Sequence, residues 1–245
     1  MEEVEGIVAN EIKYSDTSKI LNIITKERGL IGVMAKGCNR PKSPLKSVTN
    51  KLTYGKFIIY YKEEGLSLLK EVSVINYFKN IRTDIEKISY ASYLLELGYQ
   101  VYKQNNDKNI YLILINALIK IEDNFDPAVI MNIVELKYLN FLGIAPIIDS
   151  CAICNSAKDI ITLSSHKGGY ICKNCYRGEH RVSTKTIKLV RMFYHIDIAK
   201  ISSLKISDEV KTEIGTFLDD YYERYSGLYP KSKNFIKNLQ KINNN

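Results

Sequence analysis

Four of the chain's five cysteines lie in two Cys-x-x-Cys pairs within one short segment. The pairs are Cys151 with Cys154 and Cys172 with Cys175, with seventeen residues between them. This spacing is typical of two tight turns that each present two thiolates to one tetrahedral ion. The glycines at 168–169 allow the chain to reverse as a hairpin and return the second pair to the first. The pattern predicts one structural zinc ion per chain.

Other readings of the cysteines fit the sequence less well. Redox dithiols normally open a helix after a strand, and neither pair clearly does so. Disulfides are disfavoured because the amino terminus lacks the basic and apolar pattern of a secretion signal, which also predicts a cytoplasmic protein. His166 and His180 lie near enough to replace a cysteine, but four thiolates already complete a closed shell. Cys38 stands alone and is expected to have no special chemistry.

Catalytic signatures are missing from the sequence. It contains no Gly-x-x-x-x-Gly-Lys-Ser/Thr loop, no Gly-x-Gly-x-x-Gly, no His-Glu-x-x-His and no Gly-x-Ser-x-Gly. A metal ion with four thiolate ligands has no position for an activated water. His195 lies on a helical pattern, where a packed or capping histidine is expected. We therefore expect a protein that is not an enzyme.

The positive charge is concentrated in one part of the chain. The formal net charge is +8, and no acidic residue occurs between Glu27 and Glu63. Eight basic residues fall in that interval: Arg28, Lys36, Arg40, Lys42, Lys46, Lys51, Lys56 and Lys62. A solvated lysine-rich face would explain a short run, but a block without one compensating acid favours a surface for a polyanion.

Hydrophobic periodicity assigns this block to a region of short strands. Runs at 4–14, 19–25, 30–36, 52–61 and 66–75 read as five strands, and Gly29 and Gly65 end two hairpin turns. Five strands at this spacing predict a small closed or nearly closed barrel. From Thr83 the period becomes helical, with helices ending near 102, 121 and 142. Two more are expected at 183–195 and 207–225, with N-caps at Asp126, Ser183 and Ser207.

Several short motifs resemble one known family when their order is considered. They include Gly6-Ile7-Val8, Tyr14-Ser15-Asp16, the run 20–29, Ala35-Lys36-Gly37 and the stretch 142–146 that leads into Cys151. Together they resemble the RecO family of bacterial recombination and repair mediators over nearly the whole chain. Two positions depart from the family pattern, namely Asn50-Lys51-Leu52 before the fourth strand and Asn155 after Cys154.

The resemblance implies an α+β multidomain fold. It comprises an N-terminal OB-fold β-barrel at 1–80, a mainly α-helical domain at 81–150 and 181–245, and a four-cysteine zinc element inserted at 151–180. The resemblance also implies binding to single- and double-stranded DNA, annealing of complementary strands, and work with RecR and the single-stranded-DNA-binding protein to load RecA. The protein would then act at the nucleoid.

The basic block supplies the expected DNA contacts: Lys36, Arg40, Lys42, Lys46, Lys51 and Lys56. Tyr54, Phe57, Tyr60 and Tyr61 are candidates for base stacking, but alternation along a strand makes core positions the first expectation. The acidic, apolar-ended tail of the single-stranded-DNA-binding protein would need a basic rim around an apolar pocket. Lys185, Lys188 and Arg191, spaced i, i+3 and i+6, are the candidates for that rim.

Two other functions agree with the same features. An RNA-binding or ribosome-associated protein can also combine an OB barrel with a zinc element, and charge alone does not distinguish RNA from DNA. A transcriptional regulator or protein adaptor would use its helices for a partner. None of the predicted helices shows the basic, glycine-turned pattern of a recognition helix.

Overall fold

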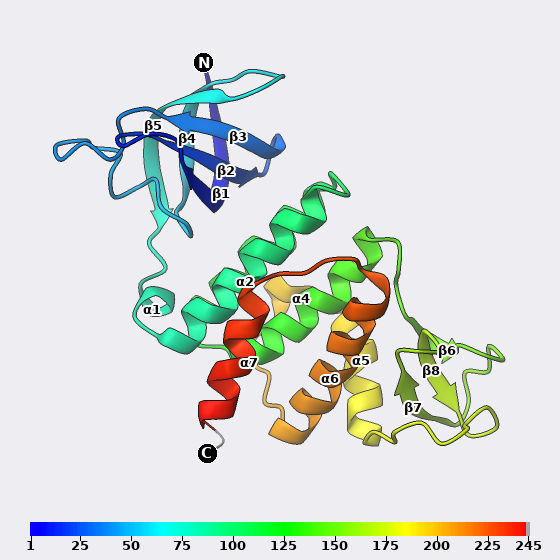
Figure 1. Ribbon diagram of the computed structural model, residues 1–245. Coiled ribbons are helices and arrows are strands. Elements are labelled where there is room, and N and C mark those ends of the chain that lie inside the picture. Colours follow the sequence, from blue (N-terminus) through cyan, green and yellow to red (C-terminus); the bar gives the residue numbers. More distant parts are fainter. Residues whose placement is uncertain (244–245) are drawn as a thin grey trace. The chain divides into compact units, whose positions relative to one another are not determined.

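The computed structural model describes residues 1–243, which form two compact units (Figure 1). The first contains residues 1–123 and the C-terminal segment from Pro230, and the second contains residues 124–229. The predicted domain boundaries at 80, 150 and 180 stay predictions, because compactness does not show which segments fold alone. Among the helices of residues 1–243, none has the length and apolar character needed to cross a bilayer.

The first unit opens with a five-stranded closed barrel, as predicted. Its strands are β1 (Glu2–Lys13), β2 (Lys19–Thr25), β3 (Gly29–Ala35), β4 (Tyr54–Tyr60) and β5 (Ser67–Asn76). Their order around the barrel is β1-β2-β3-β5-β4, and only the β3–β5 pairing is parallel. This is the arrangement of an OB-fold. The fourth strand begins at Tyr54 rather than Leu52, because Leu52 has a φ of 68°, which is incompatible with an extended strand.

Alternate side chains of each strand fill the barrel interior. The core includes Val8, Leu21, Ile23, Val33 and Phe57, all fully buried. Cys38 in the loop after β3 belongs to the same core at 0% exposure, and Leu45 packs against it. Cys38 thus contributes to the packing of the barrel core. The loop from 36 to 53 is attached to the barrel by its own apolar side chains.

Four helices complete the first unit. They are α1 (Lys79–Arg82), α2 (Ile85–Tyr102), α3 (Lys108–Glu122) and α7 (Ser232–Asn243). Asp84 caps α2 by accepting hydrogen bonds from two backbone N–H groups. Glu96 of α2 accepts hydrogen bonds from the N–H groups of Lys231 and Ser232, so a carboxylate holds the start of α7 against α2. Neither α1 nor α7 was among the helices that periodicity predicted.

The second unit combines three longer helices with a small sheet. Its elements are α4 (Pro127–Phe141), β6 (Ile147–Cys151), β7 (Ile160–Ser164), β8 (Gly169–Cys172), α5 (Thr184–His195), the 3₁₀ turn η1 (Ile198–Lys200) and α6 (Asp208–Tyr225). The sheet has the order β6-β8-β7. Asp126 and Ser183 cap α4 and α5 as predicted. Ser207 is the N-cap residue of α6, as predicted, but its side chain makes no cap hydrogen bond.

One carboxylate joins the barrel to the helices of the first unit. Glu5 of β1 accepts hydrogen bonds from the Tyr54 hydroxyl of β4 at 2.6 Å and from the Tyr111 hydroxyl of α3 at 2.8 Å. The hydrogen bond from Tyr54, opposed by burial and assisted by Tyr111, lowers the pKa of Glu5. A lowered pKa in the folded state stabilises the protein above the unfolded pKa, and this contribution is lost as the pH falls through the folded value.

The substitution Glu5→Ala is expected to lower the free energy of unfolding by about 1–3 kcal/mol, because it removes the carboxylate that accepts hydrogen bonds from two buried phenol groups. The matched control is Glu3→Ala, which removes an exposed ion pair with Lys56 and should cost less than about 1 kcal/mol. Urea titrations followed by circular dichroism compare the two variants. Equal losses of stability would contradict the role of Glu5.

Candidate metal centre and nucleic-acid interface

The four paired cysteines meet at one point of the small sheet. Cys151 ends β6 and Cys172 ends β8, while Cys154 and Cys175 lie in the turns that follow. All four Sγ atoms lie within 4.8 Å of one another, and those of Cys154 and Cys172 are 3.6 Å apart. Four thiolates around a tetrahedral ion have comparable separations. The predicted convergence of the two pairs is confirmed, and the cluster can hold a metal ion.

The backbone around the cluster favours thiolates. Burial opposes ionisation of Cys151, but backbone N–H groups of Cys172, Cys154 and Ile153 lower its pKa to about 6. The N–H of Cys172 lies 3.5 Å from the Cys151 sulfur. Hydrogen bonds of this kind stabilise the charged form that a metal ion requires. The backbone therefore favours the thiolate form of Cys151, which is the form that binds a metal ion.

Two unusual backbone positions bring the ligands together. A Cβ at Gly169 would lie 2.1 Å from the carbonyl oxygen of Ile147, so only glycine allows β8 to approach β6 this closely. Asn155, which departs from the glycine common in the family, has a φ of 59° in the turn after Cys154. Asparagine tolerates this left-handed conformation better than most residues. The departure therefore leaves the turn intact.

Four of the predicted DNA contacts lie together on the loop between β3 and β4. Lys36, Arg40, Lys42 and Lys46 are all exposed, and none of the ion pairs found among the side chains of residues 1–239 involves them. This set is called the loop cations below. The loop extends from one side of the barrel (Figure 1). Their charges are therefore available to an outside anion.

Successive tight turns hold this loop in place. Backbone hydrogen bonds join Arg40 to Gly37, Ser43 to Arg40 and Lys46 to Ser43. The loop is also fastened to β2, because the amine of Lys19 donates to the side chain of Asn50 at 2.9 Å. Since these bonds and the buried Cys38 fix the backbone, the loop cations are presented by an ordered surface.

The other two predicted contacts, Lys51 and Lys56, have partners within the protein. The amine of Lys51 donates to the carbonyl oxygen of Ser92 at 3.3 Å, and burial lowers its pKa. Lys56 lies 2.9 Å from a carboxylate oxygen of Glu3, and this hydrogen bond raises its pKa. Both residues stay predicted contacts, but each would leave an existing partner to bind DNA.

The aromatic candidates divide between the inside and the outside of the barrel. Tyr54 and Phe57 are core residues, as expected. Tyr60 is 49% exposed, which corrects the expectation that it is a core residue. The guanidinium group of Arg28 lies 4.6 Å from the ring centroid of Tyr61. Tyr60 is thus the aromatic ring of β4 that is open to a base.

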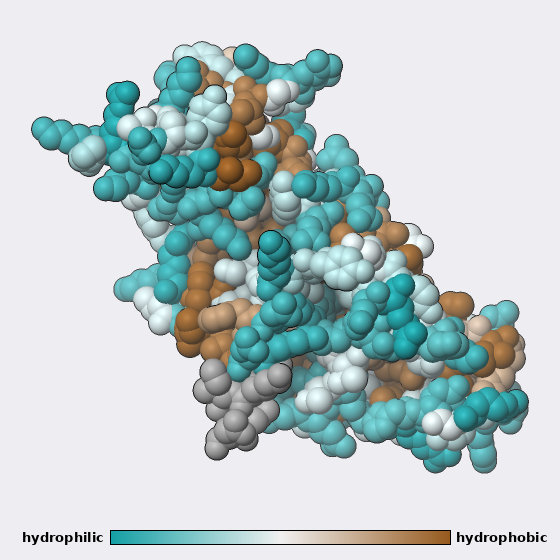
Figure 2. Space-filling model, in the orientation of Figure 1, coloured by the Kyte–Doolittle hydropathy of each residue, from teal (hydrophilic) through white to brown (hydrophobic). Residues whose placement is uncertain are grey.

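An apolar row crosses the outer surface of the barrel, and the sequence analysis did not find it. Strand register pairs Ile12 with Ile20, Ile20 with Met34, Met34 with Leu68, and Leu68 with Tyr60. Ile12 is 49% exposed and the three central residues are half-buried. Figure 2 shows apolar side chains gathered on the barrel over β2 and β3. The missed signal is the lack of polar alternation in β2, which is apolar at 20, 21, 23 and 24.

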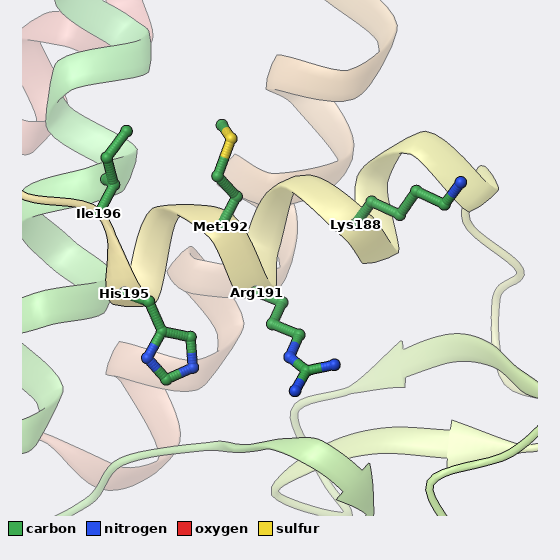
Figure 3. A pocket seen from close by; sticks show the side chains of 5 residues that line it. All are labelled: Lys188, Arg191, Met192, His195 and Ile196. Carbon is green, nitrogen blue, oxygen red and sulfur yellow. The ribbon is translucent and has the colours of Figure 1, made fainter.

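The predicted partner rim lies on α5 beside a shallow hollow of about 480 Å³ (Figure 3). The hollow is lined by Lys188, Arg191, Met192, His195 and Ile196. Figure 3 shows Met192 and Ile196 along one side of the helix and Arg191 and His195 along the other. Lys185 is exposed one turn earlier on α5 but does not line the hollow.

Comparison with known proteins identifies the family. The model "Recombination protein O N terminal" matches residues 1–78, and "Recombination protein O C terminal" matches residues 82–234. The chain belongs to the RecO family. It is 36% identical over 245 residues to a DNA repair protein RecO of Bacillus cytotoxicus, which covers 98% of each chain. A DNA repair protein RecO of Halalkalibacterium halodurans is 32% identical over 98% of this chain and 96% of that protein.

RecO membership agrees with the features described above. The N-terminal family model spans the whole barrel and its loop cations, and the C-terminal model spans the four cysteines and the hollow on α5. The predicted family is confirmed. The RecO family consists of DNA repair and recombination proteins, so the chain belongs with proteins that act in DNA metabolism.

Metal removal is expected to affect the cysteine segment alone. Purified protein should contain one metal ion per chain, and the double substitution Cys172→Ser, Cys175→Ser should lose it. Because metal binding supplies the folding free energy of a segment too small for its own core, that variant should become protease-sensitive near residues 151–180.

Elemental analysis, limited proteolysis and a DNA-binding titration test this prediction. The variant should keep most of its DNA affinity, since the loop cations lie in the other compact unit. The matched control is Cys38→Ser, which changes the remaining cysteine and should keep the metal. Metal-free wild-type protein would contradict the site.

Proposed function

We propose that this RecO protein is a recombination mediator that binds single- and double-stranded DNA, anneals complementary strands and helps RecR to load RecA. The observation that carries the proposal is the set of loop cations on an OB barrel. They are exposed and anchored, and they lie in a stretch of sequence without a carboxylate.

The mechanism requires no covalent step. Each loop cation that contacts a phosphate releases condensed counterions, which favours binding to any sequence and weakens as salt increases. Annealing follows when one positive surface holds two strands and reduces the repulsion between their phosphates. The protein then acts by positioning strands, which fits the expectation that it is not an enzyme.

The apolar row gives the same barrel a surface for unpaired bases. Met34 lies two residues before Lys36, so the row leads directly to the first loop cation. Tyr60, at the opposite end of the row from Ile12, offers a ring on which a base can stack. Bases are available to such a surface in single strands and are enclosed in a duplex. The row is thus proposed to favour single-stranded DNA, while the loop cations bind both forms.

The metal in the four-cysteine site is proposed to be zinc. Two Cys-x-x-Cys pairs at this spacing, all four donors being sulfur, suit a closed tetrahedral zinc shell. Such an ion would hold the turns after β6 and β8 together. Its proposed role is structural.

The hollow on α5 is the proposed docking place for the tail of the single-stranded-DNA-binding protein. Lys188 and Arg191 offer positive charge beside apolar Met192 and Ile196, which suits an acidic peptide with an apolar end. Lys185 would extend the charge along the helix. Contact with RecR and, indirectly, with RecA follows from the family, and the protein would act in the cytoplasm at the nucleoid.

Replacing all four loop cations by glutamine should weaken DNA binding and reduce its salt dependence. Each lost phosphate contact should lower the slope of log affinity against log salt by about 0.7 for single strands and 0.9 for duplexes. The matched control replaces four exposed lysines elsewhere: Lys79, Lys103, Lys108 and Lys205. Fluorescence titrations at several salt concentrations measure both slopes. An unchanged slope in the loop variant would move the binding site elsewhere.

The apolar row should contribute to single-strand binding only. The substitution Tyr60→Ala at the end of the row should reduce the affinity for single-stranded DNA by about tenfold, since the stacking of one base on an aromatic ring contributes on the order of 1–3 kcal/mol. Its affinity for a duplex of the same sequence should stay within about twofold. A control on the outer face, Ser73→Ala, should change neither affinity.

A matched RNA oligonucleotide that binds more tightly than DNA would instead favour an RNA-binding protein.

A further inference from the structure

A carboxylate of the protein contacts two basic residues that line the α5 hollow. Asp149 projects from β6, and its Oδ1 lies 2.9 Å from Nε of Arg191 and 3.5 Å from Nε2 of His195. Both of these residues line the hollow. Arg191 is the strongest hydrogen-bond donor among the lining residues, because its planar guanidinium group binds carboxylates in a fixed geometry.

Another carboxylate can replace Asp149 in its ion pair with Arg191. The side chains are 58% and 60% exposed, and ion pairs that are this open to solvent contribute little to stability. A carboxylate arriving from solution can therefore replace Asp149 at low cost. Lys188, which lines the same hollow, takes part in no ion pair among the described side chains of residues 1–239, so it attracts such an anion without competition from them.

We propose that Asp149 is an internal competitor that occupies the carboxylate position of this hollow until an acidic peptide with an apolar end displaces it. The carboxylate of the peptide would take the place of Asp149 on Arg191, and its apolar side chain would lie against Met192 and Ile196. This inference rests on the docking role proposed for the hollow and adds the residue that sets its affinity and selectivity.

The competitor explains how the hollow distinguishes ligands. An isolated apolar side chain gains nothing from Arg191, and a ligand with one weak anion gains little, because Asp149 already neutralises that cation. A ligand that carries several carboxylates and an apolar end gains from Lys188, Arg191 and the apolar side together. Because of Asp149, only a ligand that has both several carboxylates and an apolar end is expected to bind well.

The test uses a labelled peptide of aspartates with an apolar last residue and a free terminal carboxylate. The full-length Asp149→Asn variant should bind this peptide about twofold to fivefold more tightly than the wild type, the factor that corresponds to one exposed ion pair. The matched control is Glu223→Gln, which removes one exposed charge from α6 of the same unit and should leave the affinity unchanged.

Two further variants separate this inference from the docking role itself. Lys188→Glu, Arg191→Glu should abolish peptide binding, and unchanged binding would refute the docking site. Arg191→Gln should bind weakly, and adding Asp149→Asn to it should give no gain, since the contested cation is gone. If the charge-reversed variant loses binding but Asp149→Asn binds as the wild type does, docking stands and the competitor is refuted. Displacement of the peptide by a short oligonucleotide would overturn both by assigning the hollow to phosphates.

Discussion

Closure of the barrel is the constraint on which the proposed DNA-binding surface depends. The parallel pairing of Val33 with Ser67 and of Met34 with Leu68 joins β3 to β5 and removes the open edges of the sheet. Closure leaves an interior that accepts only apolar side chains, so every charged residue of the basic block must lie outside it. The connection from β3 to β4 then has to span one end of the barrel. Because Cys38 and Leu45 of this connection return to the core, the loop cations are held on a fixed backbone.

The small sheet of the second unit, unlike the barrel, is not closed around an apolar core of its own. It has three short strands, and Gly169 lets β8 approach Ile147 of β6 closely. The four cysteines beside it can hold a metal ion, which would add folding free energy to so small a sheet. The lowered pKa of Cys151 indicates that the backbone prepares the site for the ion. The same sheet presents Asp149 to α5. The same small sheet thus carries cysteines of the candidate metal site and the carboxylate that contacts the proposed docking hollow.

Patterns within a short stretch of sequence predicted much of this fold. Glycine turns and apolar alternation gave the five strands, and Asp126 and Ser183 marked helix starts because their side chains cap locally. The two cysteine pairs met as expected because their spacing encodes two turns. Ser207 also marked the start of α6, but its side chain makes no cap hydrogen bond, since a serine before a helix does not guarantee that its hydroxyl turns inward.

Features that depend on contacts between distant segments were not readable from the sequence. The apolar row exists only through strand register, which joins Ile12 to Tyr60 through three other strands. The partners of Lys51 and Lys56, namely Ser92 and Glu3, lie about 40 and 50 residues away along the chain. The contact of Asp149 with Arg191 likewise requires β6 and α5 to be placed first. The charge pattern therefore located the positive block but did not show which of its basic side chains already have partners within the protein.

Strand annealing is the most direct measure of the central claim that this barrel surface brings complementary DNA strands together. Two complementary labelled oligonucleotides would be mixed with the purified protein, with and without the single-stranded-DNA-binding protein, and duplex formation would be followed over time. The account predicts acceleration over the protein-free rate in both conditions, and loss of that acceleration when the four loop cations are replaced by glutamine. Annealing at the protein-free rate, or equal acceleration by the loop variant, would contradict it.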